Sequence, residues 1–344
     1  MDPQADPALR HRWSPWHDRL HRELLRHPHW LPQGEPLLLA LSGGQDSMAL
    51  TALLLGLQRL HHWDLHLWHG DHSWHGQSAA IAQELQTWCL QQGLALQISR
   101  AEQGSTPSEA AARQWRYSQL GQHAGNLGQS QTHRPCRRVV CAHTATDKAE
   151  TLLLQMVRGT DLAGLGSLRS DRPLGEPHPP TMLLVRPLLA FNREETAAIC
   201  KELNLPIWLD PSNTNLHFSR NRIRHEVMPV LQSLYPGCER RMAQLSERLS
   251  QLHNSQTTLL DLSLNSLQHD NGLDRRQLSA LALDLRRSLL ARWLQHQGAP
   301  VLNARQLNDL ATAIAPNAAP GGRDLGQGWR LHWSKNALQL EQQG

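Results

Sequence analysis

One short segment, LLLALSGGQDSMALTALLL at residues 37–55, restricts the fold more than any other part of this sequence. The five apolar residues at its start are too few to span a membrane, and they predict a buried strand. From Met48 onward the apolar residues recur at helical spacing, so a helix follows the strand. Only residues 42–47 lie between them, so the chain turns sharply where the two elements meet.

The turn has the composition of a phosphate-binding loop. A helix N-terminus leaves backbone N–H groups unpaired and carries partial positive charge. Gly43 and Gly44 let the backbone approach a ligand closely, and the hydroxyl groups of Ser42 and Ser47 add donors at the two ends. Together these features predict a site for a phosphate or a pyrophosphate.

Two common nucleotide-binding motifs are excluded. No Gly-Lys-[Ser/Thr] follows the glycines and GxGxxG is absent, so the turn is neither a Walker A loop nor a dinucleotide fingerprint. Asp46 beside a phosphate is unfavourable unless a metal cation bridges the two charges. The turn alone leaves an alternative open, an ordinary strand-to-helix connection with Asp46 as an acid at the helix start.

Strands and helices alternate through the first two thirds of the chain. The pattern predicts strands at 37–41, 63–68, 94–99, 139–142 and 182–185, and helices at 77–92, 106–120, 146–157 and 192–203, with a polar loop at 121–138. This alternation favours an α/β fold with a parallel, doubly wound sheet. The turn at 42–47 then lies at the carboxyl edge of the sheet, where such folds bind ligands.

The composition changes after residues 235–237, which read Tyr-Pro-Gly. Beyond them we expect a helix to about Leu267, a helix at 275–296, a shorter helix at 303–314 and a hairpin in the C-terminal WRLHWSKNALQLE. The chain therefore divides into an N-terminal extension (1–35) that contains one helix, an α/β domain (36–236) and a smaller helical and β domain (237–344).

Charge and cysteine content restrict the class of protein. The formal net charge of +4 permits an anionic partner without requiring one. The five cysteines form no CxxC pair, which disfavours a zinc site or a redox motif. No basic-then-apolar leader is present and no apolar run approaches membrane length, so we expect a soluble, cytoplasmic protein without membrane contact.

A second group of candidate residues lies in AHTATDKAET, at 142–151. His143, Asp147 and Glu150 follow a predicted strand, so they should face the same sheet edge as the phosphate turn. A purely structural interpretation makes Thr146 the N-cap of a helix whose dipole favours both acids. That interpretation explains the acids but not the histidine.

Two further segments supply arginines. In EAAARQWRYSQL, at 109–120, Arg113 and Arg116 lie on adjacent helix faces, so that one arginine faces solvent and the other the sheet edge; an exposed ion pair is the alternative. The segment DPSNTNLHFSRNRIRHEVMPVL, at 210–231, contains alternate arginines with an asparagine between them: Arg220, Asn221, Arg222 and Arg224. On an extended or turn segment they would line one edge and suit a nucleic-acid backbone or a triphosphate, whereas an ordinary solvated face is the alternative.

These stretches together resemble a known family. SGGQDS resembles the SGGxDS loop of the PP-loop (N-type) ATP pyrophosphatases, which cleave ATP between the α and β phosphates. Over about residues 37–231 the order of motifs resembles that of the tRNA(Ile)-lysidine synthetases: SGGQDS, EAAARQWRY, AHTATDKAET, VRGTDLAGLGSL, VRPLL and DPSNTNLHFSRNRIRHEVMPVL. GGRDLGQGWRLHW is similar, more loosely, to a short form of that family's C-terminal substrate domain.

The resemblance implies a two-step reaction that uses ATP and Mg²⁺. A carbonyl oxygen of the wobble cytidine in an isoleucine tRNA with a CAU anticodon is adenylated, and pyrophosphate leaves. Free L-lysine then attacks the activated ring carbon through its side-chain amine and expels AMP. The product, lysidine, pairs with A, so the tRNA reads AUA and is charged with isoleucine. Family members are often dimers, which makes a homodimer possible.

The resemblance also implies a role for each candidate residue. The catalytic residues are Asp46, Arg113, His143 and Asp147. ATP contacts Ser42, Gly43, Gly44, Gln45, Asp46 and Ser47, and Asp46 also holds Mg²⁺ through ATP. Free lysine contacts Asp147 and Glu150. The tRNA contacts the C-terminal domain and four residues of the arginine segment, which are Arg220, Asn221, Arg222 and Arg224.

The sequence departs from the family mainly in one place, with a lesser departure at Gly159–Asp161, where the family usually has small residues. The usual AHHxDDQAET is changed because Thr144, Thr146 and Lys148 replace the second histidine, the first aspartate and the glutamine. The role of the missing acid, for example in metal binding, is left open. The change also weakens the case for Asp147 as a partner of lysine.

Three other functions compete with this hypothesis. A PP-loop tRNA thiolase uses catalytic or cluster-binding cysteines, and no CxxC occurs here. A PP-loop amidotransferase needs an N-terminal cysteine nucleophile, whereas residue 2 is aspartate. An ATP-binding module or tRNA-binding chaperone without turnover stays open, although the intact phosphate turn and Arg113 argue against it.

Overall fold

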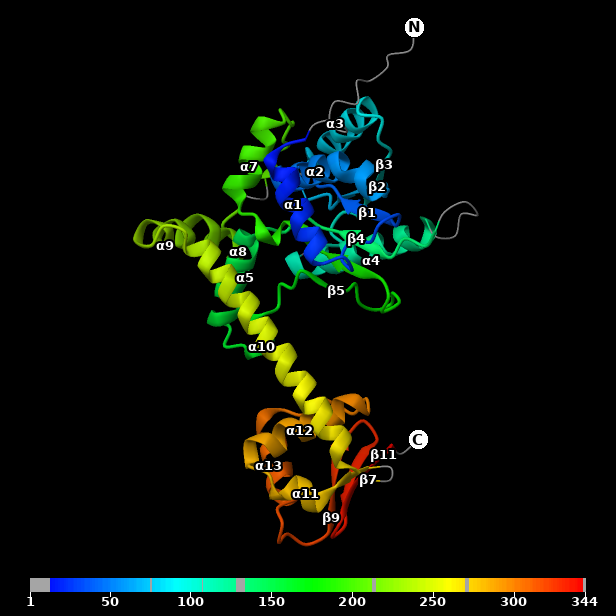
Figure 1. The fold of residues 1–344 in the computed structure, drawn as a ribbon, viewed down its shortest axis with the longest axis vertical. Coiled ribbons are helices and arrows are strands. Elements are labelled where there is room, and N and C mark those ends of the chain that lie inside the picture. Colours follow the sequence, from blue (N-terminus) through cyan, green and yellow to red (C-terminus); the bar gives the residue numbers. More distant parts are fainter. Residues whose placement is uncertain are drawn as a thin grey trace. The chain divides into compact units, whose positions relative to one another are not determined.

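The computed structural model describes residues 13–74, 76–106, 108–127, 134–211, 215–269 and 272–342. The chain folds into two compact units that divide between Ser250 and Gln251. The division falls inside the long helix α10 (Cys238–Leu267), which therefore contributes to both units (Figure 1).

The larger unit is built on a six-stranded sheet with the strand order β3-β2-β1-β4-β6-β5. The strands are β1 (Pro36–Ala40), β2 (Asp64–Asp71), β3 (Leu96–Arg100), β4 (Arg138–Val140), β5 (Asp171–Pro173) and β6 (Leu183–Val185). Strand β5 pairs antiparallel with β6, and the other pairs are parallel. The chain winds outward from β1 in one direction and restarts at β4 in the other, so the topological switch point lies between β1 and β4.

Helices cover both faces of this sheet, as predicted. Alternate residues of β1 point to opposite faces. Leu37 and Leu39 lie in a core with residues of α1 (Pro15–Arg26), α2 (Gln45–His61), α3 (Ser78–Gln91) and α7 (Arg193–Glu202). Leu38 lies in a separate core with Leu120 and Ala124 of α4 (Glu109–Leu127). The doubly wound α/β prediction is therefore confirmed.

The remaining elements of the larger unit pack around α5 (Ala145–Val157). They are α6 (Leu162–Leu165), the 3₁₀ turn η2 (Pro187–Ala190), α8 (Ser219–Arg222), the π-helical turn η4 (Ile223–Val227), α9 (Met228–Leu234) and the first half of α10. Ala149 of α5 forms a small core with Met228 and Cys238. The chain from 219 to 250 is thereby fixed against the helix that carries Asp147 and Glu150.

The smaller unit combines helices with an antiparallel sheet of order β7-β8-β11-β10-β9. Its further elements are β7 (Gln268–His269), β8 (Gly272–Asp274), α11 (Arg275–Ala280), α12 (Leu283–His296), α13 (Ala304–Ala313), β9 (Gly321–Gly326), β10 (Trp329–Trp333) and β11 (Ala337–Gln342). Leu289 and Leu290 of α12 pack with Leu331 and Leu338 of the sheet. The predicted hairpin is confirmed as the pair β10 and β11.

The single helix predicted at 275–296 is wrong, because α11 ends at Ala280 and α12 begins at Leu283. The buried guanidinium of Arg286 donates hydrogen bonds to the carbonyl oxygens of Ser279 and Leu281. These carbonyls therefore have a partner without a continuous helix. The sequence pattern shows the shared apolar face but not this break.

The loop predicted at 121–138 is wrong for its first part, because α4 continues to Leu127; residues 128–133 lie outside the described part of the chain. Gly121 is buried in this helix, and a Cβ built on it would lie 2.3 Å from the ring of His178. The glycine permits a close contact with a neighbouring segment and does not end the helix.

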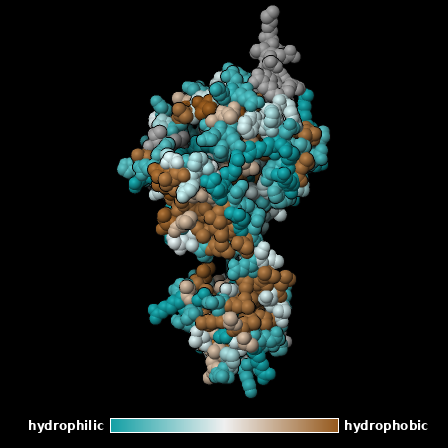
Figure 2. All heavy atoms as spheres, turned by 60° about the vertical axis from the view of Figure 1, so that its left-hand side comes forward, coloured by the Kyte–Doolittle hydropathy of each residue, from teal (hydrophilic) through white to brown (hydrophobic). Residues whose placement is uncertain are grey.

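Among the described helices, none has both the length and the apolar character needed to cross a bilayer. Figure 2 shows apolar surface gathered on the lower part of the larger unit. Exposed apolar side chains of α5, α9 and the first half of α10 include Met156, Val157, Val230, Leu234 and Leu245.

Candidate functional site

The loop between β1 and α2 is closed by its own two serines. Ser47 Oγ accepts a hydrogen bond from Ser42 N (3.2 Å) and donates one to Gly44 O (2.9 Å). Gly44 is the N-cap of α2, and no side chain caps the helix. The first N–H groups of α2 therefore stay available to an anion at the carboxyl edge of the sheet.

Gly43 gives the loop its shape. Its φ of +82° lies in the left-handed region that disfavours other residues. Its carbonyl oxygen accepts a hydrogen bond from Trp208 N at 3.0 Å, and a Cβ built on Gly43 would lie 3.4 Å from the Trp208 ring. The segment that contains Trp208 thus holds the loop from outside.

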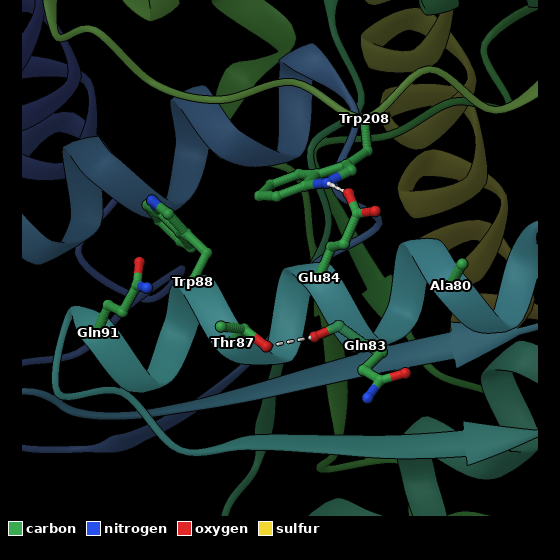
Figure 3. Close-up of a pocket in the computed structure, with 7 residues that line it drawn as sticks. All are labelled: Ala80, Gln83, Glu84, Thr87, Trp88, Gln91 and Trp208. Carbon is green, nitrogen blue, oxygen red and sulfur yellow. Dashed lines mark hydrogen bonds between the residues drawn. The ribbon is translucent and has the colours of Figure 1, made fainter.

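A cavity of about 480 Å³ lies on the other side of Trp208, against α3. Figure 3 shows the rings of Trp208 and Trp88 above this helix, with Glu84 Oε2 accepting a hydrogen bond from Trp208 Nε1 at 2.8 Å. The residues around the cavity are Ala80, Gln83, Glu84, Thr87, Trp88, Gln91 and Trp208. Because none of the predicted catalytic residues lines it, the candidate site is the sheet edge and not this cavity.

Asp46 lies in the first turn of α2 and contacts α7. Its Oδ1 accepts a hydrogen bond from Thr196 Oγ1 at 2.5 Å, and its Oδ2 lies 3.7 Å from Arg193 Nε. Burial raises the pKa of the Asp46 carboxyl, while the charge of Arg193 opposes that rise. The side chain of Gln45 also contacts α7, since its Nε2 donates to Arg193 O and to Thr196 Oγ1. The side chain of Gln45 is therefore held by α7.

The second half of the site begins where β4 ends. Thr144 is the N-cap of α5 and forms a capping box with Asp147, whose Oδ2 accepts a hydrogen bond from Thr144 N at 2.8 Å. The prediction that Thr146 caps this helix is wrong, because Thr146 already lies inside its first turn. Thr146 Oγ1 instead donates to Glu239 of α10 and accepts from Arg193 N.

The predicted lysine-binding acids and two predicted tRNA-binding arginines form one cluster. Arg220 donates to Asp147 Oδ1 (2.8 Å) and Glu150 Oε2 (2.9 Å). Arg224 donates to both oxygens of Glu150, at 2.7 and 2.8 Å. Burial alone would raise the pKa of Asp147, but the charges of Arg220 and Arg224 and the hydrogen bond from Thr144 N act together against burial and hold the pKa well below its usual range. The two acids are buried, the two arginines are partly buried, and their formal charges balance.

The arginine segment is helical, so the prediction of alternate arginines on an extended edge is wrong. In a helix, residues four apart share a face, which brings Arg220 and Arg224 together on α5. Arg222 points elsewhere and forms an exposed ion pair with Glu226. Asn221 is buried, and its Nδ2 donates to Asn215 O.

His143 lies between β4 and α5 with a partly buried ring. Its Nδ1 is buried and has no hydrogen-bond partner among the residues that the structure describes. Burial lowers the pKa of His143 well below its ordinary value, and the charge of Arg186 lowers it further. The ring is therefore neutral at neutral pH.

The two arginines of α4 divide as predicted. Arg113 is exposed, and its Nη1 donates to the hydroxyl of Tyr117 at 3.3 Å. Arg116 turns inward to His72, at the carboxyl end of β2, with 3.0 Å between Nη2 and the ring Nε2. Arg113 is near enough to His143 for its charge to act on the histidine, in addition to burial and Arg186.

The first residue of α7 joins the two halves of the site. Strands β1 and β4 are neighbours, so the loop and the start of α5 lie on either side of the switch point. Arg193 N donates to Thr146 Oγ1 of α5, and Arg193 O accepts from Gln45 of α2.

The sequence patterns do not identify Arg193, Thr196 and Trp208 as parts of this site. The sequence does contain one signal for Arg193 and Thr196. They lie at the start of a helix that follows a parallel strand, and such a helix begins at the carboxyl edge of the sheet. The sequence carries no comparable signal for Trp208, which lies in an irregular segment.

A parallel sheet with this loop after its first strand, an open helix N-terminus and an acid in the first turn defines a PP-loop protein. Residues 18–231 match the family model described as the PP-loop domain. The chain is 57% identical over 329 residues to the tRNA(Ile)-lysidine synthase of Parasynechococcus marenigrum (strain WH8102), covering 96% of this chain and 95% of the relative. It is 43% identical over 267 residues to that of Gloeobacter violaceus, covering 77% and 78%. The chain belongs to the tRNA(Ile)-lysidine synthase family of PP-loop proteins.

Among solved structures, the U34-tRNA thiolase NcsA from Methanococcus maripaludis is similar in fold. The TM-score is 0.53 at 16% identity, over 68% of this chain and 78% of that one. At this identity the likeness shows the fold alone.

Proposed function

We propose that this chain forms lysidine at the wobble cytidine of an isoleucine tRNA with a CAU anticodon, through an adenylated tRNA intermediate. The family membership supports the overall reaction. The observation that carries the proposal is the placement of the phosphate loop and the His143–Glu150 segment on either side of one switch point. Because tRNA, ATP and lysine are the substrates, we place the reaction in the cytoplasm.

In the first step the loop binds the phosphates of ATP. The N–H groups at the start of α2 stabilise the pyrophosphate as negative charge builds up on it. Mg²⁺ fits this site, because Asp46 offers a carboxylate next to the phosphate position; the ion would be held by Asp46 and phosphate oxygens and would neutralise phosphate charge. Exposed Arg113, whose charge acts on His143, is assigned a contact with the nucleotide.

In the second step the side-chain amine of lysine loses a proton and attacks the activated carbon. Neutral His143 has one unprotonated ring nitrogen that can accept a hydrogen bond from the lysine amine and orient it, whereas its lowered pKa makes it a weak base. For the lysine ammonium we propose Asp147 and Glu150 as the partners. Because Arg220 and Arg224 already bind these acids, the ammonium competes with the two arginines for the carboxylate oxygens.

For tRNA we propose contacts to the arginine segment and the C-terminal domain. Among its four predicted contact residues, Arg222 is the one with an exposed guanidinium, and its ion pair with Glu226 is a weak surface pair that a phosphate can displace.

The thiolase alternative is disfavoured by the state of the cysteines. All five are free and buried: Cys89, Cys136, Cys141, Cys200 and Cys238. Burial raises the pKa of Cys89 and Cys200 to about 12 and that of Cys136 to about 11. Such thiols stay protonated and are poor nucleophiles.

The products of ATP cleavage test the first step. With Mg²⁺ and the CAU-anticodon isoleucine tRNA, we expect AMP and pyrophosphate, and tRNA-dependent exchange of labelled pyrophosphate into ATP. Cleavage to ADP, or exchange without any need for tRNA, would contradict the proposal. Binding of ATP without any cleavage would favour the non-catalytic ATP-binding module.

A further inference from the structure

We propose that Arg193 binds the pyrophosphate end of ATP and holds the pyrophosphate as it leaves. Arg193 lies outside the residues that the sequence motifs identify, and the inference rests on the ATP chemistry proposed for the loop. Three features support it: a fixed backbone position, a guanidinium with free donors, and a loop that lacks a cation of its own.

The backbone of Arg193 is fixed between two helix N-termini. Its N–H donates to Thr146 Oγ1 in the first turn of α5, at 3.2 Å. Its carbonyl oxygen accepts from Gln45 Nε2 in the first turn of α2, at 2.6 Å, and from Thr196 Oγ1, at 3.0 Å. The side chain therefore starts from a defined point beside the phosphate loop.

The guanidinium of Arg193 has donors to spare. Its Nε lies 3.7 Å from Asp46 Oδ2, which is too long for a hydrogen bond, and its side chain is 34% exposed. Within the described part of the chain it donates no hydrogen bond, whereas Arg220 and Arg224 each donate hydrogen bonds to acids of α5. Thr196, which is completely buried, already holds Asp46 through its other oxygen. Arg193 is thus not needed to fix Asp46.

The chemistry of the first step calls for a cation here. A bond forms between the cytidine oxygen and the α phosphorus, and the bond from that phosphorus to the α–β bridging oxygen breaks. The electron pair leaves with pyrophosphate, so negative charge accumulates beside Asp46. The SGGQDS loop contains no lysine or arginine. A guanidinium donates two parallel hydrogen bonds to phosphate oxygens and keeps its charge throughout.

The experiment compares pyrophosphate with AMP as ligands of the full chain, by calorimetry with Mg²⁺ present. For Arg193→Gln we expect pyrophosphate to bind about 10- to 100-fold more weakly, while AMP binds as in wild type. Arg193→Lys keeps the charge but loses the paired N–H donors of the guanidinium. Its affinity for pyrophosphate should lie between those of wild type and Arg193→Gln. Arg240→Gln is the matched control. Arg240 of α10 also contacts helix α7, but it forms an ion pair with Glu195 (3.0 Å) and not with Asp46.

Unchanged pyrophosphate binding in Arg193→Gln would overturn the inference. Equal weakening of pyrophosphate and AMP would also overturn it, since that result marks a structural role. The function proposed above is tested separately by lysine transfer. If wild type binds pyrophosphate through Arg193 but transfers no lysine to tRNA, the inference stands and the lysidine function fails.

Discussion

At the scale of single residues, Asp46 is the side chain on which the proposed metal role depends. Replacing Asp46 by Asn keeps its size and the hydrogen bond from Thr196 but removes the charge. We expect tRNA adenylation to fall at least about 100-fold, because the loss of electrostatic stabilisation at a reacting centre has effects of this order. Binding of tRNA, measured by filter retention, should not change. Adenylation at the wild-type rate would contradict a role for Asp46 in holding Mg²⁺.

Gly43 tests the shape of the loop. Its positive φ makes Gly43→Ala strained by about 1–2 kcal/mol, and the new methyl group meets the Trp208 ring. We expect weaker ATP binding and a lower midpoint of thermal unfolding. Gly125→Ala in α4 is the control, because a Cβ there meets nothing within 4 Å and alanine favours a helix. Equal ATP affinity in the two variants would show that the loop tolerates a side chain.

The residues of the phosphate loop could be predicted from the sequence because they are contiguous and local geometry explains each of them. Arg193, Thr196 and Trp208 could not, since they contact the loop from segments that lie far away along the chain. Tertiary packing decides which groups donate hydrogen bonds to Asp46 and to the carbonyl oxygen of Gly43. A local sequence pattern does not contain this information.

At the scale of elements, the acid–arginine cluster fastens the 219–234 segment to α5. Arg220→Ala leaves buried Glu150 without one of its partners, so we expect a loss of about 3–5 kcal/mol in the free energy of unfolding. Arg222→Ala removes an exposed pair and should cost less than about 1 kcal/mol. Urea unfolding of the two variants measures both values. Similar small losses would show that the cluster contributes little to stability.

The pH dependence of this difference follows from Asp147. Its pKa is lowered in the folded state, so its contribution is present above the unfolded pKa of about 3.9 and is lost as pH falls toward the lower folded value. The difference in the free energy of unfolding between wild type and Arg220→Ala should therefore be constant from pH 5 to 8 and decrease only below about pH 4. A gap that disappears near neutral pH would contradict the assigned charges.

The family departures in α5 have structural partners. Lys148 is buried and forms an ion pair with Glu247 of α10, while Thr146 binds Glu239 of the same helix. Thr144 caps α5. These three residues thus join α5 to α10 or start the helix, which the sequence pattern does not reveal because α10 is about 90 positions away.

Element types were predicted better than element ends. The parallel strands follow from short apolar runs, and the observed strands agree with them to within a few residues. The helix at 275–296 and the loop at 121–138 were wrong because an arginine side chain and a close glycine contact decided the outcome. The extended arginine edge was wrong because spacing alone does not distinguish a helix from a strand over five residues.

At the scale of the whole molecule, the cysteines separate two PP-loop chemistries. With pKa values of about 11 to 12, Cys89, Cys136 and Cys200 stay protonated at pH 8. We expect iodoacetamide to leave them unmodified in the native chain and to modify them in urea, as read by mass spectrometry. Rapid alkylation of any of the three in the native chain, with loss of activity, would favour the thiolase alternative.

The division of the chain into units lies within α10, between Ser250 and Gln251, whereas the composition changes near residue 237. The change in composition marks where helix α10 begins. Side-chain packing decides to which of the two units each turn of this helix belongs. The first turns of α10 contact α5, so they belong to the larger unit. The three-segment domain plan and the homodimer stay predictions.

The most direct test of the central claim is transfer of radiolabelled lysine to purified tRNA with ATP and Mg²⁺. The isoleucine tRNA with a CAU anticodon is compared with an elongator methionine tRNA, which carries the same anticodon. We predict that label enters the isoleucine tRNA alone. Label in neither tRNA, from a chain that still binds ATP, would contradict the lysidine function, and label in both would contradict the proposed specificity.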